Sequence, residues 1–388
     1  MYTDAYPNQR GAQNNFCGTI DGFLGNASAC LNKSLESLDL SYNNLLGKIP
    51  DSLGKLGSLR YLNLGFNSFW GSIPASIGSL SSLQDLGLSN NEMNGTIPES
   101  FGQLLKLGPI PLWFTNVTEL YLKSNSFSGS IPSNIDDLMP RLRCLDLSKN
   151  NSMVQFLCPY GKNDLGGLYL RSNKLSGGLP HHWNESQLLW VVDISYNNLS
   201  GKISSSTGFL SSLHVLVLSN NNLYGEIPSS LQNCSFVSID LSGNHLSGIL
   251  PSRKGSEVKI LHLRSNQFSG IIPQQWCNLP VLHILDLAQN NLFGRIPNCL
   301  GNFTALIYGN GIIWPSFYVN YVEKAIIVTK GRELEYGSTL QFVTSIDISW
   351  NNLIGGIPDK ITSLIALNTL NLSRNHLTGN VPKNIGNM

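Results

Sequence analysis

The 388-residue chain is 41% hydrophobic and only 13% charged, whereas ordinary globular proteins carry roughly 25% charged residues. Its formal net charge is +1 and it contains no run of like charges, which excludes the basic footprint of a nucleic-acid-binding protein. No stretch reaches the roughly 18 consecutive apolar residues of a membrane span. The first residues, MYTDAYPNQRG, lack the apolar core of a signal peptide.

Residues 1–34 contain no complete match to the repeat that follows them. We expect this segment to be a remnant of an N-terminal cap, or a degenerate one. Cys17 and Cys30 fall within it, and a disulfide between them is one possibility that the sequence leaves open.

From residue 35 the chain repeats itself, mostly at intervals of 22 to 25 residues. The segments SLRYLNLGFNSFWGSIP, SLQDLGLSNNEMNGTIP and SLHVLVLSNNNLYGEIP all fit the template L-x-x-L-x-L-x-x-N-x-L-x-G-x-I-P. Such self-similarity is the signature of a repeat architecture. The central asparagines of the thirteen matches are Asn43, Asn67, Asn91, Asn125, Asn150, Asn173, Asn197, Asn221, Asn244, Asn266, Asn290, Asn351 and Asn375.

Each fixed position of the template has a physical role. In the segment 62–64 the Leu-Asn-Leu alternation predicts a short strand with both leucines inward. Asn67 can pair backbone groups that the turn leaves open, and Gly71 permits a backbone angle that a Cβ opposes. Pro74 ends the extended stretch.

One repeat buries too little apolar surface to fold alone, so neighbouring repeats must stack. The sequence therefore predicts an α/β solenoid: a curved, right-handed superhelix with a parallel inner β-sheet and short 3-10 or helical turns on the convex side. We expect repeats 1–11 in residues 35–306 and repeats 12–13 in residues 343–388.

Two repeats depart from the template. The interval from Asn91 to Asn125 is 34 residues and contains a repeat tail, Gly108 to Pro111, without a head. We expect irregularity over residues 99–116, and a missing block of sequence near 105–107. The repeat after Asn150 has no G-x-I-P tail, so residues 151–164 are also expected to be irregular.

A larger interruption follows residue 306. Residues 307–342 are rich in aromatic side chains and lack the template, which predicts an inserted island with a strand at 324–329. After the final repeats the chain stops inside a repeat unit. Together with the polar N-terminus, this leads us to expect a fragment of a longer protein.

The run YVEKAIIVTKGRELEYGSTLQFVTSIDISWNNLIGGIP resembles the corresponding region of plant leucine-rich-repeat receptor-like proteins. The likeness is strongest to the ethylene-inducing-xylanase-receptor type and its fruit-tree scab-resistance relatives. It implies a plasma-membrane receptor without a kinase domain, whose repeats lie on the extracellular face and whose single membrane helix would be missing from this chain. It also implies a microbial protein or peptide ligand, a leucine-rich-repeat receptor kinase as co-receptor, a role in plant defence, and no cofactor.

Ligand-contact candidates are outward positions of the inner sheet that carry aromatic residues or arginine, the types that dominate interface hot spots. Scattered exposed aromatics are also common without a function. The candidates are Tyr61, Phe66, Tyr121, Tyr169, Arg171, Trp190, Tyr196 and Trp350. A column of aspartates on the same face repeats because the unit repeats, and we interpret it as structural: Asp39, Asp146, Asp193, Asp240, Asp286 and Asp347.

The island supplies a second set of candidates for contact with a co-receptor. These are Tyr318, Tyr321, Lys330 and Arg332. For the two tyrosines, and for Trp314 and Phe317, the alternative is that they anchor the island on the solenoid. For the two basic residues the alternative is a solvated charged loop.

Seven cysteines leave at least one thiol without an intrachain partner. Cys277 and Cys299 occupy equivalent places in successive repeats, 22 residues apart, so a disulfide between them is expected. Cys144 and Cys158 form a further possible pair, which leaves Cys234 as a small core residue.

Ten Asn-x-Ser/Thr sequons occur, against about seven expected by chance from the composition. The candidate glycosylation sites are Asn26, Asn32, Asn94, Asn116, Asn150, Asn184, Asn198, Asn233, Asn302 and Asn371.

Signals for catalysis are weak. The sequence has no G-x-S-x-G, H-E-x-x-H or C-x-x-C motif, and the adjacent histidines at 181–182 lack metal-ligand spacing. We therefore predict a binding protein with no catalytic or metal site. The alternatives are a secreted inhibitor of the polygalacturonase-inhibitor type, against which the island argues, and the ectodomain of a receptor kinase.

Overall fold

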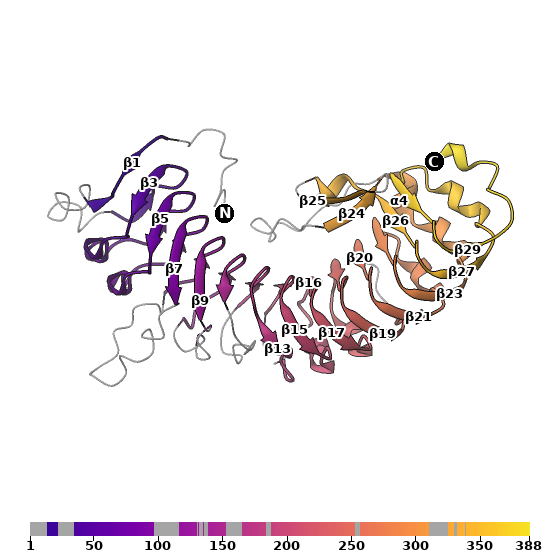
Figure 1. Ribbon diagram of the computed structural model, residues 1–388, viewed down its shortest axis with the longest axis horizontal. Coiled ribbons are helices and arrows are strands. Elements are labelled where there is room, and N and C mark those ends of the chain that lie inside the picture. Colours follow the sequence, from indigo (N-terminus) through magenta and orange to yellow (C-terminus); the bar gives the residue numbers. More distant parts are fainter. Residues whose placement is uncertain are drawn as a thin grey trace. The chain divides into compact units, whose positions relative to one another are not determined.

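The computed structural model describes residues 14–21, 35–96, 116–129, 131, 135, 139–152, 165–183, 188–252, 257–309, 325–329, 332–337 and 339–388. The chain divides into two compact units, Met1–Leu199 and Ser200–Met388. Each unit is a stack of repeats in which one strand of every repeat joins a first parallel sheet and another joins a second (Figure 1).

In the first unit, each strand of the first sheet lies beside the strand of the next repeat, with pairs such as Leu38 with Leu62 and Leu86 with Leu120. These strands are β2 (Ser37–Asp39), β4 (Tyr61–Asn63), β6 (Asp85–Gly87), β8 (Glu119–Tyr121), β10 (Cys144–Asp146), β12 (Gly167–Tyr169) and β14 (Val191–Asp193). The second-sheet strands are β1 (Cys17–Gly18), β3 (Asn44–Gly47), β5 (Ser68–Gly71), β7 (Glu92–Thr96), β9 (Ser126–Gly129), β11 (Asn151–Ser152), β13 (Ser176–Gly177) and the start of β15 (Asn198–Gly201).

The second unit repeats this plan. Its first-sheet strands are β16 (Val215–Val217), β18 (Ser238–Asp240), β20 (Ile260–His262), β22 (Ile284–Asp286), β26 (Ser345–Asp347) and β28 (Thr369–Asn371). Its second-sheet strands, after the end of β15, are β17 (Asn222–Gly225), β19 (His245–Ile249), β21 (Gln267–Gly270), β23 (Asn291–Arg295), β27 (Asn352–Gly355) and β29 (His376–Leu377).

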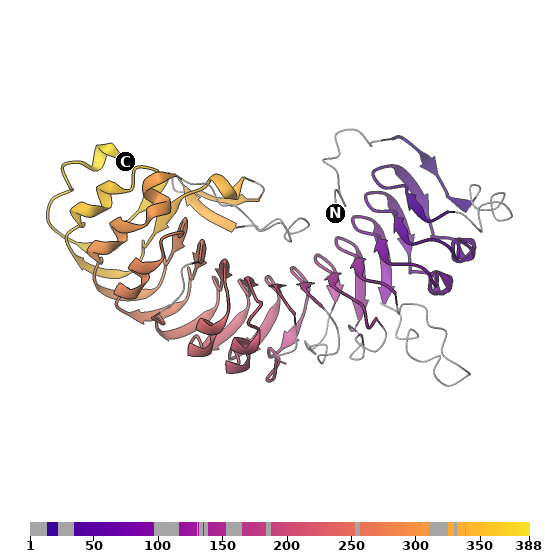
Figure 2. The same cartoon turned by 180° about the vertical axis from the view of Figure 1, so that it is seen from behind.

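Short helical turns follow many of the G-x-I-P tails and can be followed in Figure 2. A proline with φ near −65°, such as Pro273 or Pro358, precedes most of them, and its carbonyl accepts the first turn's hydrogen bond. Proline suits this place because its fixed φ matches a helix start and its missing N–H is not needed there. The turns are η2 (Asp51–Lys55), η3 (Ala75–Ser79), η5 (Ser205–Phe209), η6 (Ser229–Asn233), η7 (Gln274–Asn278), η8 (Asn298–Asn302), α4 (Thr304–Tyr308), η10 (Leu340–Phe342), η11 (Asp359–Ser363) and η12 (Ile385–Asn387).

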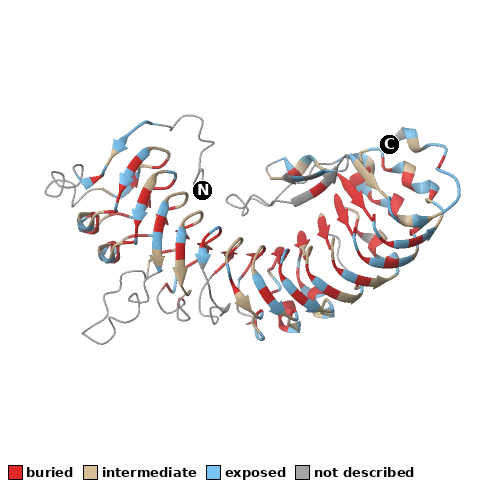
Figure 3. Cartoon of the chain, viewed as in Figure 1, coloured by how far each residue is buried: buried red, intermediate tan, exposed pale blue. Residues whose placement is uncertain are grey.

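The core of each unit is a column of aliphatic side chains between the two sheets and the helical turns. Leu62 and Leu64 are fully buried in the first unit, and Leu216 and Leu218 are buried in the second. Figure 3 shows buried residues alternating with exposed or half-buried ones in strands such as β15 and β23, whereas β14 and β16 are buried throughout. The expected inward direction of both template leucines is confirmed, and it fixes which side chains face solvent.

The repeat asparagine closes each turn with its side-chain amide. Asn67 Nδ2 donates to the carbonyls of Leu64 in its own repeat (3.1 Å) and of Leu40 in the preceding repeat (2.9 Å). Asn67 Oδ1 accepts from the N–H of Leu45, again in the preceding repeat (3.0 Å). One side chain therefore satisfies groups on two repeats and holds them in register. The asparagines form such a ladder in both units.

The residue before each ladder asparagine adopts a left-handed backbone conformation. The φ angle is 54° at Phe66, 54° at Tyr196 and 53° at Trp350. This region is unfavourable for bulky side chains. It persists here because the ladder hydrogen bonds on either side determine the turn.

The 34-residue interval forms one repeat. Strand β6 pairs directly with β8, and Asn125 Nδ2 donates to the carbonyl of Leu88 (3.0 Å) just as in shorter repeats. Residues 97–115 of this interval lie outside the described residues. In the other irregular repeat, β11 keeps two residues and β12 still pairs with β10.

The expected island leaves the stack without breaking it. Strand β22 pairs directly with β26, so Asp286 lies beside Asp347. Strand β24 (Ala325–Thr329) covers most of the predicted strand, and β25 (Arg332–Tyr336), which we did not predict, pairs with it antiparallel. Ile327 of this hairpin is buried against Ile260 and Ile284.

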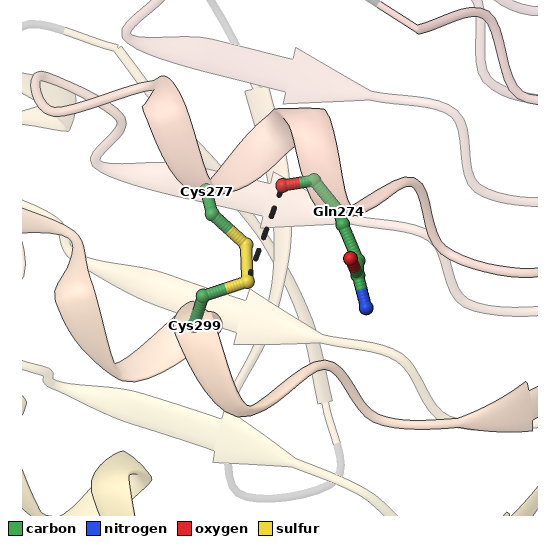
Figure 4. Close-up of a disulfide and its surroundings, with 3 residues drawn as sticks. All are labelled: Gln274, Cys277 and Cys299. Carbon is green, nitrogen blue, oxygen red and sulfur yellow. Dashed lines mark hydrogen bonds between the residues drawn. A yellow bond between two sulfur atoms is a disulfide. The ribbon is translucent and has the colours of Figure 1, made fainter.

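Cys277 and Cys299, the pair expected from their spacing, form a disulfide between η7 and η8 with a Cα–Cα distance of 5.4 Å (Figure 4). Cys17 is exposed, and Cys30 lies outside the described residues. Cys144 is a buried thiol, and its expected partner Cys158 is also outside them. Cys234 is buried, and its Sγ donates to the carbonyl of Thr207.

Replacing a ladder asparagine is expected to destabilise the second unit strongly. Asn351 Nδ2 donates to the Leu287 carbonyl (3.0 Å) and Oδ1 accepts from the Leu292 N–H (3.0 Å). Asn351→Ala leaves these buried groups unpaired and should lower the free energy of unfolding by about 3 kcal/mol or more. Urea titration measures this change, with the adjacent exposed Asn352→Ala as control, expected below about 0.5 kcal/mol. Equal effects of the two variants would contradict the ladder's role.

Removing the disulfide is expected to destabilise the same unit. A 22-residue separation predicts a loss of about 3 kcal/mol for Cys277→Ser/Cys299→Ser, because the unfolded chain gains freedom. The measurement is urea unfolding without reductant, with the exposed Cys17→Ser as control. Loss of less than about 0.5 kcal/mol, or peptide mapping that finds Cys277 and Cys299 unlinked, would show the prediction to be wrong.

Candidate ligand-binding face

The solvent side of the first sheet, which we call the inner face, presents rows of side chains held in register by strand pairing. In the first unit one row contains Tyr61, Asp85, Glu119 and Cys144, which are register partners on β4, β6, β8 and β10. The next row contains Tyr121, Asp146 and Tyr169 on β8, β10 and β12. These rows combine carboxylates with tyrosines.

The two carboxylates of the first row lie on adjacent strands. Burial, and next the negative charge of Glu119, raise the pKa of Asp85 to about 6, although a hydrogen bond from Thr118 lowers it. Glu119 also accepts a hydrogen bond from the Tyr121 hydroxyl (2.6 Å). We did not single out Asp85 or Glu119 from the sequence. An alignment of the repeats would have found them. Both are acids at one outward strand position, which is occupied by serine in the first repeat and by tyrosine in the second.

Two of the aromatic residues predicted to contact a ligand, Trp190 and Tyr169, pack closely against a pair of glycines. A Cβ added at Gly166 would lie 2.0 Å from Trp190 Nε1, and one added at Gly167 would lie 2.9 Å from the Tyr169 hydroxyl. Tyr169 is consequently only 7% exposed. The prediction that Tyr169 offers an exposed contact is therefore wrong, because the glycine beneath it lets the ring pack against the backbone. Trp190 remains partly exposed.

Three other candidates lie beside the inner face, at the left-handed turn position after a strand. In the first unit, Phe66 stacks on Tyr42 with 4.0 Å between ring centroids, and the Arg171 guanidinium lies 4.6 Å from the Tyr196 ring centroid. In the second unit, Arg374 lies 5.1 Å from the Trp350 ring centroid. Each of these three aromatic rings therefore packs against one further aromatic or basic side chain.

Each carboxylate of the aspartate column accepts hydrogen bonds from its own turn. Asp39 Oδ1 accepts from the N–H (2.9 Å) and the hydroxyl (2.6 Å) of Ser41. The same paired bonds recur at Asp146, Asp193, Asp240 and Asp347, while Asp286 accepts from the Ala288 N–H. These contacts support the structural interpretation of the column, since each carboxylate shapes its own turn.

In the second unit the inner face is largely buried around the island hairpin. Arg264 Nη1 lies 3.2 Å from Asp347 Oδ2 and 3.6 Å from Asp286 Oδ2, and both carboxylates are almost fully buried. Burial raises the pKa of Asp286 to about 6, although the charges of His262 and Arg264 oppose this. His262 is 2% exposed, and its Nε2 makes no hydrogen bond to any described residue. This charged cluster was also missed from the sequence, since a buried position cannot be recognised without knowing where the hairpin packs.

Of the island candidates only Arg332 can be placed. It begins β25, is exposed, and pairs with Thr329 across the hairpin. Tyr318, Tyr321 and Lys330 lie outside the described residues, as do the possible anchors Trp314 and Phe317.

The sequons differ in access. Asn150 is 8% exposed and serves as a ladder asparagine whose Nδ2 donates to the Leu122 and Leu147 carbonyls. Its prediction as a glycosylation site is therefore wrong, because the amide that would carry the glycan is buried and bonded. Asn94, Asn198, Asn233 and Asn302 are exposed, while Asn116 and Asn371 are partly buried and donate hydrogen bonds. Asn26, Asn32 and Asn184 lie outside the described residues.

Neither a metal site nor a membrane helix is found in the part of the chain that the structure describes. There, no three His, Cys, Asp or Glu side chains are grouped so that they could hold an ion. Within the same ranges, no helix is both long and apolar enough to cross a bilayer.

The leucine-rich repeat family model matches residues 34–56, 58–80, 82–104, 116–138, 212–234, 235–253, 257–279, 281–303 and 366–388. These matches cover more than half of the chain and coincide with the stacked repeats. The chain belongs to the leucine-rich repeat family.

The curated relatives of this leucine-rich repeat chain are plant receptor-like proteins. Receptor-like protein EIX2 of Solanum lycopersicum is 32% identical over 331 residues, which cover 68% of this chain and 32% of that protein. Receptor-like protein 35 of Arabidopsis thaliana is 39% identical over 264 residues, covering 63% of this chain and 24% of that protein. The chain thus spans about a third or less of the length of these relatives, and the resemblance to plant receptor-like proteins is confirmed.

Solved structures of plant receptor ectodomains share the fold. The TDR receptor has a TM-score of 0.71 at 27% identity, covering 96% of this chain and 61% of that one. The ectodomain of the Arabidopsis receptor kinase HAESA with an extended IDA peptide hormone has a TM-score of 0.66 at 29% identity, covering 96% of this chain and 62% of that one. Their likeness agrees with the predicted leucine-rich-repeat solenoid.

The stability of the first unit is expected to depend on pH through Asp85. Its pKa in the folded chain is raised from 3.8 to about 6, so the folded state binds this proton more tightly than the unfolded state. The associated stabilisation is complete below about pH 4 and is lost as the pH rises through about 6. Asp85→Asn removes this pH dependence. The free energy of unfolding of the variant minus that of the parent should therefore be larger at pH 7 than at pH 4.

Urea unfolding of both proteins at the two pH values measures this difference. The exposed Asp51→Asn is the control and should show no such change, because Asp51 lies in η2, away from the carboxylate pair. A stability difference between Asp85→Asn and the parent that is the same at pH 4 and pH 7 would contradict the prediction.

Proposed function

We propose that the chain is a ligand-recognition region of a plant cell-surface receptor-like protein that perceives a microbial protein or peptide. The observation that carries this proposal is the inner face of the first unit. Its rows bring Tyr61, Asp85, Glu119 and Tyr121 together on neighbouring strands, and the turns beside them add Phe66, which is 43% exposed. Curated relatives that are receptor-like proteins support the receptor assignment.

Recognition on this face requires no chemistry from the chain. Tyrosine rings give contact area with few rotatable bonds, and the carboxylates select hydrogen-bond donors or basic groups on the ligand. Because strand pairing fixes the side chains, little freedom is lost when a ligand binds. An extended segment of ligand could meet successive repeats one after another.

A receptor without its own kinase needs a partner to signal. We propose a leucine-rich-repeat receptor kinase as co-receptor, in contact with the exposed side of the island hairpin where Arg332 lies. The similar Arabidopsis receptor kinase HAESA has a crystal structure in complex with the peptide hormone IDA and the co-receptor SERK1, which supports this kind of partner. The chain would then act in defence signalling at the extracellular face of the plasma membrane.

Two other functions share the fold. The solved ectodomain of the receptor kinase HAESA favours a receptor-kinase ectodomain, and a kinase domain encoded downstream of residue 388 in the full gene would decide for it. A polygalacturonase inhibitor is less well supported, because the hairpin β24–β25 interrupts the repeats.

The ligand face can be tested with purified secreted microbial proteins, beginning with a fungal xylanase. Immobilised chain should bind a protein of this panel, and Tyr61→Ala/Phe66→Ala should weaken that binding at least tenfold, about 1.4 kcal/mol. The control is Trp70→Ala, whose side chain is 46% exposed on the second sheet of the same unit.

Equal binding by the two variants would exclude the inner face of the first unit as the ligand site. Inhibition of purified polygalacturonase by the chain, without binding to any panel protein, would replace the receptor proposal with the inhibitor function.

A further inference from the structure

The helical turns of the second unit each bury one apolar side chain. It is the third residue after the tail proline: Leu231 in η6, Trp276 in η7 and Leu300 in η8, which are 4%, 2% and 1% exposed. Where two turns belong to consecutive repeats they pack against each other, as η5 does with η6 and η7 does with η8. The turns and their apolar residues therefore close one side of the core.

The repeat between η6 and η7 departs from this pattern in its sequence. Its tail proline is Pro251, and the segment SRKGSE that follows contains no apolar residue before Val258. Pro251 precedes Leu261 of the next strand by ten residues, whereas Pro273 precedes Leu285, the register partner of Leu261, by twelve. This repeat is therefore too short and too polar to supply the apolar side chain that the other turns bury.

A cavity lies between the core residues of the neighbouring repeats at this place. Its volume of about 40 Å³ holds about three water-sized groups, which is close to the size of a branched aliphatic side chain. The walls are mostly apolar and include Leu231 of η6, Leu263 after β20 and Trp276 of η7. The polar residues of the lining are Gln232 and Ser252.

The wall formed by η7 is held in place from two sides. Trp276 Nε1 donates to the carbonyl of Pro251 (3.0 Å), which fixes the indole ring along the cavity. On the other side, the disulfide between Cys277 and Cys299 joins η7 to η8 (Figure 4). These bonds oppose a movement of η7 that would close the cavity.

The cavity adjoins a wider cleft of about 640 Å³, with which it shares Gln232 and Ser252. Gln232 is the fourth residue of η6. The fourth residue of η5 is Gly208, where an added Cβ would lie 2.3 Å from the carbonyl oxygen of Ser230 in the adjacent turn. A glutamine fits at this position of η6 because the next turn, η7, belongs to a repeat further along. The cleft is thus a gap in the row of turns.

The lining shows what kind of partner fits this gap. Its depth accepts one aliphatic side chain, the residue type that the intervening repeat omits. Glu226 is the single charged side chain among the described residues that line the cleft and the cavity, and it favours a basic group on the partner. Glu226 lies two residues before Pro228, so this basic group belongs on the N-terminal side of the partner's turn.

We propose that the cleft binds a short helical turn of a partner protein, which places a leucine side chain in the cavity and a basic side chain beside Glu226. The partner's turn then lies between η6 and η7 in the way that consecutive turns of this chain lie against each other. The site belongs to the second unit and uses none of the residues of the inner face, so it does not rest on the ligand proposed for that face.

The probe is the peptide acetyl-Lys-Pro-Ser-Ser-Leu-Gly-amide, which has the proline-to-leucine spacing of η6. Saturation-transfer NMR with the full chain, over a series of peptide concentrations, measures the affinity and shows which protons touch the protein. We expect a dissociation constant of roughly a millimolar, with the strongest transfer to the leucine methyl groups. Peptides with alanine or tryptophan in place of leucine should each bind at least tenfold more weakly, because alanine leaves the cavity unfilled and an indole exceeds it.

Variants of the chain locate the site. Ser252 is exposed and lines both cavity and cleft, so Ser252→Trp places a ring at the mouth of the cavity and should weaken peptide binding at least tenfold. The matched control is Ser363→Trp at an exposed position of η11, which should leave binding unchanged. Glu226→Gln should abolish the preference for lysine over glutamate at the first peptide position, which is expected to be about threefold in the parent.

Far-UV circular dichroism and the unfolding midpoint verify that each variant is folded. Equal binding of the leucine and alanine peptides, or undiminished binding by Ser252→Trp, would overturn the proposal. Self-association of the chain that Ser252→Trp abolishes, without any binding of the peptide, would also overturn it and assign the cleft to a second copy of the chain.

Discussion

The side-chain amide of the repeat asparagine is the contact on which the rest of the structure depends. At each turn it pairs carbonyls of two consecutive repeats and accepts an N–H from the earlier one, as Asn266 does with Leu241, Leu263 and Leu246. These groups lie away from water, where an unpaired backbone group is costly. Because every repeat meets its predecessor through the same bonds, equivalent residues of different repeats line up in rows on the first sheet.

The rows differ in residue type at the open positions, which are those that the repeat template does not fix. In the first unit the open positions of the inner face hold acids and tyrosines on neighbouring strands. In the second unit Ile260 and Ile284 occupy equivalent positions and receive the island hairpin instead. Equivalent positions of the repeat therefore face solvent in the first unit and contact the chain's own island hairpin in the second.

The periodic part of the structure could be predicted from the sequence. Inward leucines, the asparagine turns and the Cys277–Cys299 disulfide follow from local spacing, which repeats many times and sets its own register. Features that depend on a particular neighbour could not be predicted. Tyr169 is buried because Gly167 offers room beneath its ring, and the cluster of His262, Arg264 and Asp286 is buried where the hairpin comes to lie on the adjacent strands.

The hydrogen bond that a ladder asparagine accepts from the preceding repeat keeps the same length whatever the number of residues between its donor and the asparagine. Within the first unit, Phe69 N–H donates to Asn91 over a separation of 22 residues and Met93 N–H to Asn125 over 32, both at 3.0 Å. In the second unit, Leu292 N–H donates to Asn351 over 59 residues, also at 3.0 Å. Unequal recombination within such a gene can lengthen or shorten the loops between turns while the register survives, so new recognition segments can arise without a new fold.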